Sequence, residues 1–357
     1  MKRKRILFTG GGTAGHVTAN TVLMPKFRAN GWELHYVGSE HGIERKMISE
    51  YEHVKYHGIS TGKLRRYMSW SNITDIFKVL KGIVQAYFIV RKINPDIVFS
   101  KGGFVSVPVV IGARLRRVPI VIYEPDVNLG LANRISYTFC TKMCTTFEET
   151  AVQYPSNKTV HVGAIVKEEL QQVSAERGRT ACEFTKDKPI LLVVGGSQGA
   201  QRINDIVRST LPYLLLHFQV IHICGAGKVD STINHNDYKQ FEFVGQLYPD
   251  LVAMADVVVS RAGSNTLHEL LALRKPMLLI PHTVGGAKTG QLINAKHFCD
   301  KGYAAMIRQE EMTEEQFVRA VLDVYEQREC YIEAMRQNVT NQAVDKLIAL
   351  IDDVLQQ

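Results

Sequence analysis

Short apolar runs alternate with longer stretches of helical periodicity along the first part of the chain. Runs rich in β-favouring residues lie at 6–9, 34–37, 96–100 and 118–123. Helical patterns fill the intervals near 17–30, 42–51, 73–93 and 107–116. Strands separated by helices pair in parallel and are covered on both faces, so the pattern predicts an α/β domain with a parallel sheet.

The same order begins again in the second half. The apolar run 190–194 leads into the glycine-rich loop 195–200 and a further helical pattern. We therefore predict two Rossmann-like α/β domains facing one another, residues 1–163 and 164–340. The tail 341–357 has a helical period with no strand after it, and we expect it to pack across the domain junction.

Composition adds a preference for anionic partners. The 357 residues are 45% hydrophobic and 22% charged, as in an ordinary globular chain of two domains. The formal net charge of +8 suits phosphates, nucleic acid or anionic lipid without choosing among them. No basic and aromatic motif of a known nucleic-acid-binding module accompanies this charge, so we expect no nucleic-acid partner.

The cysteines and the N-terminus predict a protein that is cytoplasmic and soluble, or held at a membrane surface. No two cysteines form a Cys-x-x-Cys pair and no His pair stands at zinc spacing, so we expect reduced, mostly buried thiols and no metal site. The basic residues 1–5 precede an apolar run shorter than the roughly 7–15 residues of a signal peptide. No segment approaches the roughly 18 apolar residues of a membrane span. The cysteines are Cys140, Cys144, Cys182, Cys224, Cys299 and Cys330.

Four glycine-rich loops follow predicted strands, at 10–16, 100–106, 195–200 and 260–265. Ligands bind beyond the carboxyl ends of parallel strands, and glycine N–H groups at a helix N-terminus favour anions. The loops therefore predict a shared cleft for phosphate or diphosphate groups. The first loop, Gly10-x-Gly12-x-x-Gly15, also matches a dinucleotide fingerprint with Glu40 as ribose acid, so a nicotinamide or flavin dehydrogenase stays open.

His16 stands directly behind the first loop. A histidine there can act as a general base near neutral pH, as a cation at a diphosphate, or as a packing residue. The residue type and its place leave these three roles open.

Five motifs occur in an order that covers nearly the whole chain. They are GGTAGH at 11–16, KGGFVS at 101–106, GGSQG at 195–199, SRAGS at 260–264 followed by Glu269, and QLINA at 291–295. In this combination the chain resembles the MurG family, the peptidoglycan glycosyltransferases that add N-acetylglucosamine to a membrane lipid precursor. The resemblance implies a GT-B architecture, with the sugar nucleotide in the second domain and the acceptor in the first.

The resemblance also implies the reaction. The C4 hydroxyl of a lipid-diphosphate-linked N-acetylmuramyl pentapeptide attacks the anomeric carbon of UDP-N-acetylglucosamine, and UDP leaves with inversion. We expect no cofactor and no metal, because helix dipoles and Lys or Arg can carry the charge of the leaving group. The implied partners are the lipid-linked muramyl peptide, an anionic membrane surface at its cytoplasmic face, and other cell-wall and division proteins.

Site residues follow from the resemblance, position by position. Glu269 matches the acceptor of the ribose hydroxyls, Val244 a backbone contact to uracil, and Gln291 the reader of the sugar hydroxyls. His16 becomes the general base or a ligand of the acceptor diphosphate, beside Gly12, Gly102 and Gly103. The donor-binding set is Thr13, Ala14, Gly15, Lys167, Ser197, Val244, Ser264, Asn265, Thr266, Leu267, Glu269 and Gln291.

Two stretches depart from the family's usual pattern. The chain reads Gly-Ala-Ile-Val-Lys at 163–167 where the family commonly has Gly-Asn-Pro-Val-Arg, so Lys167 offers one ammonium group instead of an arginine fork. It reads Tyr-Glu-Pro-Asp at 123–126 where the family has His-Glu-Gln-Asn. The carboxylate of Asp126 accepts hydrogen bonds but donates none, and it is a rival candidate for the general base.

A basic and aromatic stretch at 63–70 precedes apolar residues at helical spacing between 73 and 88. This combination is typical of an interfacial membrane segment, and it also fits a core helix with a basic lead-in. Periodicity alone leaves both interpretations open.

Three further functions share much of the predicted site. A UDP-sugar epimerase has the same two-domain fold, a transferase for another acceptor shares all the donor residues, and a sugar-nucleotide sensor binds without turnover. These remain alternatives to the implied reaction.

Overall fold

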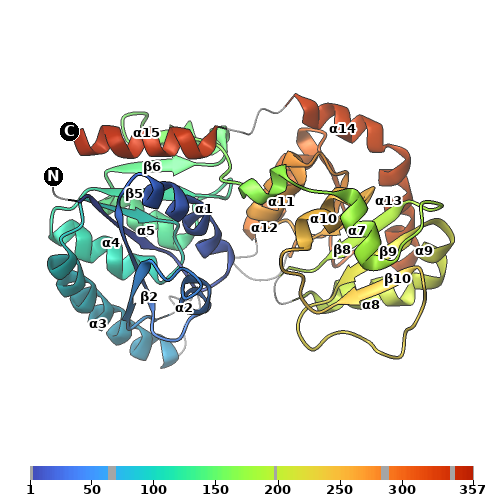
Figure 1. Ribbon diagram of the computed structural model, residues 1–357, viewed down its shortest axis with the longest axis horizontal. Coiled ribbons are helices and arrows are strands. Elements are labelled where there is room, and N and C mark those ends of the chain that lie inside the picture. The colour runs from blue at the N-terminus through green and yellow to red at the C-terminus, as the bar shows by residue number, and fades with distance from the viewer. Residues whose placement is uncertain (1–2, 63–69, 197–198, 283–288, 338–341, 357) are drawn as a thin grey trace. The chain divides into compact units, whose positions relative to one another are not determined.

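The computed structural model describes residues 3–62, 70–196, 199–282, 289–337 and 342–356. The chain divides into two compact units, Met1–Ile165 with Thr340–Gln357, and Val166–Val339. In Figure 1 the first unit contains the blue to green elements and the red C-terminal helix. Each unit is built on one sheet covered by helices.

The first unit contains a seven-stranded sheet in the order β3-β2-β1-β4-β5-β6-β7. Every neighbouring pair is parallel, which confirms the predicted parallel α/β domain. The strands are β1 (Arg5–Thr9), β2 (Glu33–Ser39), β3 (Val54–Ile59), β4 (Ile97–Ser100), β5 (Ile120–Glu124), β6 (Lys142–Thr145) and β7 (Thr159–His161).

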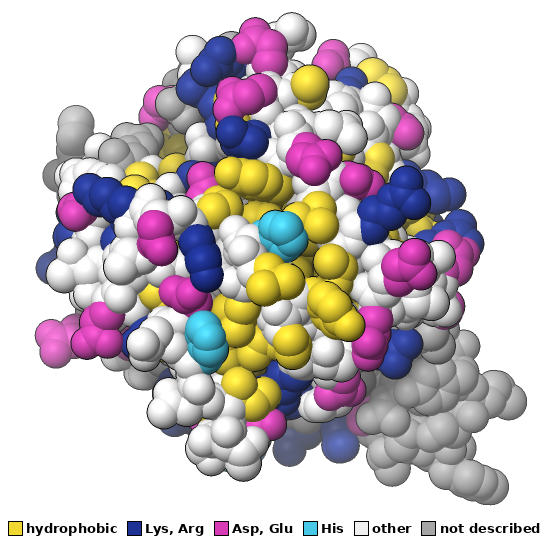
Figure 2. Space-filling view, turned by 90° about the vertical axis from the view of Figure 1, so that its right-hand side faces the viewer, with side chains coloured by type: hydrophobic (Ala, Val, Ile, Leu, Met, Phe, Trp, Pro, Cys, Tyr) yellow, Lys and Arg dark blue, Asp and Glu magenta, His cyan; other side chains and the backbone are white. Residues whose placement is uncertain are grey.

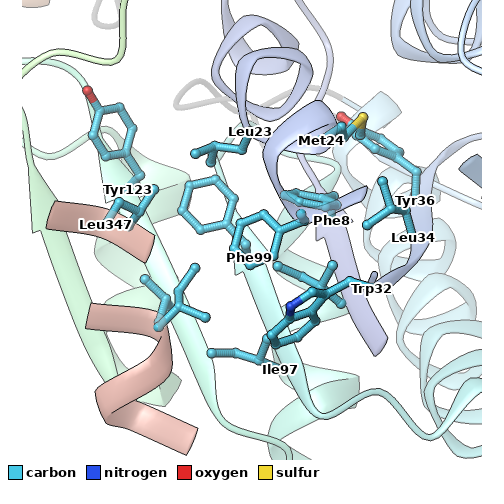
Figure 3. Close-up of a cluster of buried hydrophobic side chains, with 14 of the residues drawn as sticks. Phe8, Leu23, Met24, Trp32, Leu34, Tyr36, Ile97, Phe99, Tyr123 and Leu347 are labelled. Atoms are coloured by element: carbon cyan, nitrogen blue, oxygen red, sulfur yellow. The ribbon is translucent and has the colours of Figure 1, made fainter. Parts of the chain in front are cut away.

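Helices connect these strands and bury the two faces of the sheet in separate apolar clusters. In the cluster of Figure 3, the ring of Phe8 from β1 meets Phe27 and Phe99 edge to face, at centroid distances of 5.9 and 6.0 Å. The helices are α1 (Gly15–Ala29), α2 (Ile43–Ile48), α3 (Trp70–Ile93), α4 (Ser106–Leu115), α5 (Leu131–Phe139) and α6 (Glu148–Ala151).

The C-terminal helix α15 (Ala343–Gln356) also belongs to the first unit. Its apolar stripe of Leu347, Ile351 and Val354 is buried in the core cluster around Phe8, and its packing across the domain junction stays a prediction. Figure 3 shows Leu347 beside the side chain of Tyr123 from β5. The helix therefore completes the core of a unit whose other elements lie before residue 166.

The second unit contains a six-stranded parallel sheet in the order β10-β9-β8-β11-β12-β13. The strands are β8 (Ile190–Val194), β9 (Gln219–Ile223), β10 (Tyr238–Phe241), β11 (Val257–Ser260), β12 (Met277–Leu279) and β13 (Ala304–Met306). Around them lie a short 3-10 turn (Glu168–Gln171) and α7 (Ala175–Cys182), α8 (Gln201–Ser209), α9 (Leu211–His217), α10 (Tyr248–Met254), α11 (Ser264–Ala272), α12 (Thr289–Asp300), α13 (Glu314–Glu326) and α14 (Arg328–Arg336).

On the side of the second unit that carries α9, the described residues present positive and negative side chains intermixed (Figure 2). Figure 2 shows this side, where a central group of hydrophobic side chains is surrounded by Lys, Arg, Asp and Glu. The large apolar residues exposed on α9 are Tyr213 and Leu216. Within the described parts of the chain, no helix is both long and apolar enough to cross a membrane.

Candidate active site

The first glycine loop is held by a buried carboxylate. Glu44 at the start of α2 is fully buried and accepts hydrogen bonds from the backbone N–H of Gly12 (3.1 Å) and of Ser39 (2.9 Å). A Cβ at Gly11 would lie 2.5 Å from the Glu44 carboxyl carbon, so a larger residue does not fit there. The Gly12 N–H, expected on the acceptor diphosphate, is therefore already engaged by Glu44. Glu44 is not recognisable from the sequence, because a glutamate in a short helix carries no distinguishing signal.

The second loop packs directly on the first. Gly102 and Gly103 have φ angles of +91° and +83°, in the left-handed region that favours glycine. A Cβ at Gly103 would lie 2.2 Å from the Gly11 carbonyl oxygen and 3.0 Å from Cδ2 of His16. The structure thus brings together the loops after β1 and β4 and the histidine, as the parallel sheet predicts for adjacent strands.

His16 lies in the first turn of α1 with its ring only partly exposed. Its Nδ1 is buried, and a hydrogen bond with the Lys101 backbone acts to raise the pKa of the ring. Burial first, and the positive charge of Lys101 second, lower the pKa of His16 to about 4, while Asp126 and Glu44 act in the opposite direction. The ring is therefore neutral near pH 7, which favours a proton acceptor over a cation at a diphosphate.

Two buried charged residues, Lys101 and Glu124, lie at the ends of the neighbouring strands β4 and β5, and we call this pair the buried floor of the first unit. Lys101, which follows β4, is 0% exposed, and its Nζ lies 4.4 Å from the ring centroid of Tyr123 without a hydrogen-bond partner. Glu124, the last residue of β5, accepts from the N–H groups of Asp126 and Gly130 and from the Asn133 amide, at 3.0 to 3.1 Å. Burial lowers the pKa of Lys101 and raises that of Glu124.

Replacing Lys101 by methionine should raise the free energy of unfolding at pH 7 by about 1 to 2 kcal/mol, because it removes a cation whose burial opposes its charge more strongly than Glu124 and Asp126 support it. Burial lowers the pKa of Lys101 from 10.5 to about 8, so the side chain loses its charge at a lower pH in the folded protein than in the unfolded chain. The destabilisation of the folded protein by this charge therefore decreases as pH rises from about 8 toward 10.5. Denaturant unfolding should show a smaller difference in the free energy of unfolding between the variant and the unsubstituted protein at pH 10 than at pH 7. Lys158→Met is the control, because Lys158 also lies 4.4 Å from a tyrosine ring but donates to a carbonyl. A less stable Lys101→Met protein would contradict this interpretation.

In the second unit, α11 begins at the fourth glycine loop. Gly263 precedes the helix, and Ser264, Asn265 and Thr266 form its first turn, followed by Leu267. The N–H groups of a first helical turn point along the axis and favour an anion. The structure therefore places the residues expected at the donor diphosphate at a helix N-terminus.

Glu269 lies one turn further along α11, and burial raises its pKa to about 7. The charge of Lys167 acts against this shift and that of Glu169 adds to it, so both side chains lie near the Glu269 carboxyl group. Nζ of Lys167 is 3.9 Å from the Glu169 carboxylate. Tyr248 also lies near, because the Glu269 charge contributes to its raised pKa. Tyr248 and Glu169 were not predicted from the sequence, because they stand outside the five motifs.

Gln291 on α12 has a fixed amide orientation. Its Oε1 accepts a hydrogen bond from the His282 N–H at 3.0 Å, so the amide N–H groups remain as its donors. The Asn294 amide donates to the Ala262 carbonyl at 3.4 Å and so connects α12 to the loop before α11. β11 and β12, which precede these helices, are parallel neighbours.

Four further residues predicted to bind the donor lie in loops or at the start of a helix. Val244 lies three residues beyond β10 and is partly exposed. Thr13 is exposed in the first loop, and Ala14 and Gly15 lie at the start of α1. Ser197 lies outside the described residues. Among the residues that the structure describes, no group of three His, Cys, Asp or Glu side chains is arranged to hold a metal ion.

Comparison with known proteins identifies the family to which the chain belongs. The glycosyltransferase family 28 N-terminal domain matches residues 6–145, and its C-terminal domain matches residues 190–350. The chain is 50% identical, over 99% of both chains, to the "UDP-N-acetylglucosamine--N-acetylmuramyl-(pentapeptide) pyrophosphoryl-undecaprenol N-acetylglucosamine transferase 1" of Bacillus thuringiensis (strain Al Hakam). It is 50% identical to the transferase of this name from Geobacillus thermodenitrificans (strain NG80-2), over 98% of this chain and 99% of the relative.

Solved structures show the fold. The crystal structure of MurG from Acinetobacter baumannii matches with a TM-score of 0.77 at 22% identity, over 98% of this chain and 99% of that chain. The UDP-GlcNAc 2-epimerase from Neisseria meningitidis matches with a TM-score of 0.69 at 12% identity, over 99% and 100%. With two parallel sheets of GT-B type and both family domains present, the chain belongs to glycosyltransferase family 28, among the UDP-N-acetylglucosamine transferases of the MurG family.

Proposed function

We propose that the protein transfers N-acetylglucosamine from UDP-N-acetylglucosamine to the C4 hydroxyl of a lipid-diphosphate-linked N-acetylmuramyl pentapeptide, in peptidoglycan synthesis. The observation that carries this proposal is 50% identity over 99% of both chains to a transferase of that name. The dehydrogenase interpretation leaves the second glycine-loop unit, Glu269 and Gln291 without a role.

The first unit supplies the base. The hydroxyl oxygen of the acceptor attacks the anomeric carbon while the bond from that carbon to the UDP oxygen breaks, and the hydroxyl proton must be accepted. His16 is neutral near pH 7 and its Nδ1 is buried, so Nε2 is the nitrogen that takes the proton. Asp126, partly exposed and close enough to His16 to influence its pKa, is the rival acceptor.

The second unit holds the donor. Glu269 accepts the ribose hydroxyls, and the amide donors of Gln291 read the sugar. The developing charge on UDP is stabilised by the N-terminus of α11 and the ammonium group of Lys167. Lys167 contributes one charge without the two-point geometry of an arginine. No metal is invoked for this step.

We also propose that α3 rests on an anionic membrane surface. Five apolar residues of α3 are more than half exposed and recur at helical spacing. They are Ile76, Phe77, Leu80, Val84 and Phe88. On the opposite face of α3, Ala86 and Val90 are buried in the apolar core of the first unit. The same helix therefore packs on the core with one face and exposes apolar side chains on the other. Lys78 and Lys81 flank this surface. Residues 63–69 of the basic lead-in lie outside the described residues.

The double substitution of Phe77 and Leu80 by serine should reduce binding to anionic vesicles roughly tenfold, because it removes two apolar side chains that are 68% and 53% exposed. The matched control is Tyr213→Ser with Leu216→Ser on α9, at 61% and 72% exposed. Sedimentation with phosphatidylglycerol vesicles at low and high salt measures the effect. Equal loss in both double variants, or no binding of the parent protein at low salt, would reject the role of α3.

Acceptor dependence tests the proposed reaction against its alternatives. Labelled UDP-N-acetylglucosamine is incubated with the protein, with and without the lipid-linked muramyl peptide. A transferase moves the label to lipid only when the acceptor is present. A UDP-sugar epimerase, which shares the fold at a TM-score of 0.69, would convert the donor in the absence of acceptor. A sensor would bind the donor and leave it unchanged.

A further inference from the structure

The hydroxyl group of Tyr123 joins three segments of the first unit. It lies 2.6 Å from the Thr146 hydroxyl oxygen, 3.0 Å from the Gly163 carbonyl oxygen, and 3.2 Å from the Ile165 backbone nitrogen. Tyr123 lies in β5, Thr146 directly follows β6, and the other two residues follow β7. One side-chain oxygen therefore connects the ends of three adjacent parallel strands.

The chemistry of the partners fixes the direction of each hydrogen bond. The Gly163 carbonyl can only accept, so the tyrosine hydroxyl donates its one proton there. The Ile165 N–H can only donate, so the hydroxyl accepts from it, and the Thr146 hydroxyl donates to the remaining lone pair. The donor and both acceptor positions of the Tyr123 hydroxyl are thus filled within the protein.

The segment held in this way is where the chain leaves the first unit. Ile165 is the last residue of its continuous part, and Lys167 follows two residues later in the second unit. Gly163 has a φ of +92°, which allows the turn that presents both its carbonyl and the Ile165 N–H to one oxygen. Tyr123 and Ile165 both stand where the chain departs from the family's usual pattern.

The ring of Tyr123 also lies beside the buried floor of Lys101 and Glu124. Nζ of Lys101 lies 4.4 Å from the ring centroid, and Glu124 is the next residue in β5. Tyr123 is 2% exposed, so its position is set by packing against these groups. The same side chain therefore contacts the buried floor and the segment that leads to Lys167.

We propose that Tyr123 is a positioning residue, whose hydroxyl fixes segment 163–165 and thereby the place at which Lys167 is presented to the donor diphosphate. The inference rests on the proposed function, because it assigns Lys167 to the donor. Loss of the hydroxyl should therefore weaken donor binding while the chemistry at the acceptor is little changed.

Tyr123→Phe removes the hydroxyl and keeps the ring over Lys101. Hydrogen exchange followed by mass spectrometry should show faster exchange of the amides at 163–167, centred on the Ile165 N–H, with other peptides unchanged. The KM for UDP-N-acetylglucosamine should rise roughly fivefold, as expected for the loss of about one hydrogen bond, with little change in kcat or in the KM of the acceptor. Tyr238→Phe is the control, because it removes a buried hydroxyl that contacts His222 in the core of the second unit.

A second variant tests the same hydrogen bond from its other end. Ile165→Pro removes the N–H and leaves Tyr123 intact, whereas Ile165→Val keeps the N–H and serves as its control. The proline variant should raise the donor KM, and combining it with Tyr123→Phe should add little, because both remove one contact. If the proline variant fails to fold, the exchange and kinetic results of Tyr123→Phe decide.

Unchanged exchange at 163–167 in Tyr123→Phe, an unchanged donor KM, or a KM change equal to that of Tyr238→Phe would overturn the proposal. Failure of the proposed function is distinguishable from these results. It would appear as an absence of transfer by the unsubstituted protein, which is measured first.

Discussion

Substitution of His16 by alanine is expected to lower kcat at least about a hundredfold, within the range for loss of a general base. The ring lies against the glycine loop that follows β4, is held neutral by burial and by Lys101, and keeps one nitrogen out of contact with solvent. Its remaining nitrogen is the proton acceptor in the proposed reaction. Steady-state kinetics with saturating donor and acceptor measure the effect, and near-normal turnover would remove His16 from the mechanism.

The pH dependence of kcat sharpens this test. A base must be deprotonated to act, so the rate should fall as pH falls through about 4, the lowered pKa of His16. Two substitutions separate His16 from its rival Asp126. His16→Ala should abolish the acidic limb and Asp126→Asn should preserve it, and the opposite pattern would assign the base to Asp126.

Substitution of Glu269 by glutamine is expected to lower kcat/KM for UDP-N-acetylglucosamine roughly a hundredfold. A carboxylate can accept two ribose hydroxyls, and each hydrogen bond to a charged group contributes about 1.5 to 3 kcal/mol. The substitution keeps the size of the side chain and removes the charge and one acceptor. Donor binding by isothermal titration calorimetry should show the same loss, and an unchanged Kd would exclude Glu269 from the ribose site.

The ionisation of Glu269 gives a second signature. Burial raises its pKa to about 7, so donor affinity of the unsubstituted protein should increase as pH rises through 7, while the glutamine variant should show no such increase. A raised carboxyl pKa means that burial opposes the charged form, so folding loses stability as pH rises from 4.5 toward 7. The glutamine variant should therefore be no less stable at pH 8, which separates lost binding from misfolding.

The sheets and the glycine loops could be predicted from the sequence because they depend on local pattern. Apolar runs such as β8 are buried along their whole length, and the alternation with helices allowed only parallel pairing. The loops at Gly11 and Gly103 lie at the ends of adjacent strands, so parallel order alone brought them together. The positions of Ser264 and Glu269 in the first turns of α11 followed from the same rule.

Contacts between distant segments could not be predicted in this way. Nothing in the sequence distinguishes Glu44 from a solvated carboxylate, although the fold buries it beneath Gly12. The periodicity of α3 is the same whether its apolar face meets protein or solvent, and the structure exposes Phe77 and Leu80. Lys101 belonged to a recognisable motif, but its burial depends on β5 and on the ring of Tyr123.

The most direct test of the central claim is the stoichiometry of the reaction. The purified protein is incubated with UDP-N-acetylglucosamine and the lipid-linked muramyl peptide, the lipid product is analysed by mass spectrometry, and released UDP is quantified. We predict that each acceptor gains one N-acetylhexosamine for each UDP released, and that no UDP is released without acceptor. An unchanged lipid accompanied by UDP release, or by an isomerised donor, would contradict the account.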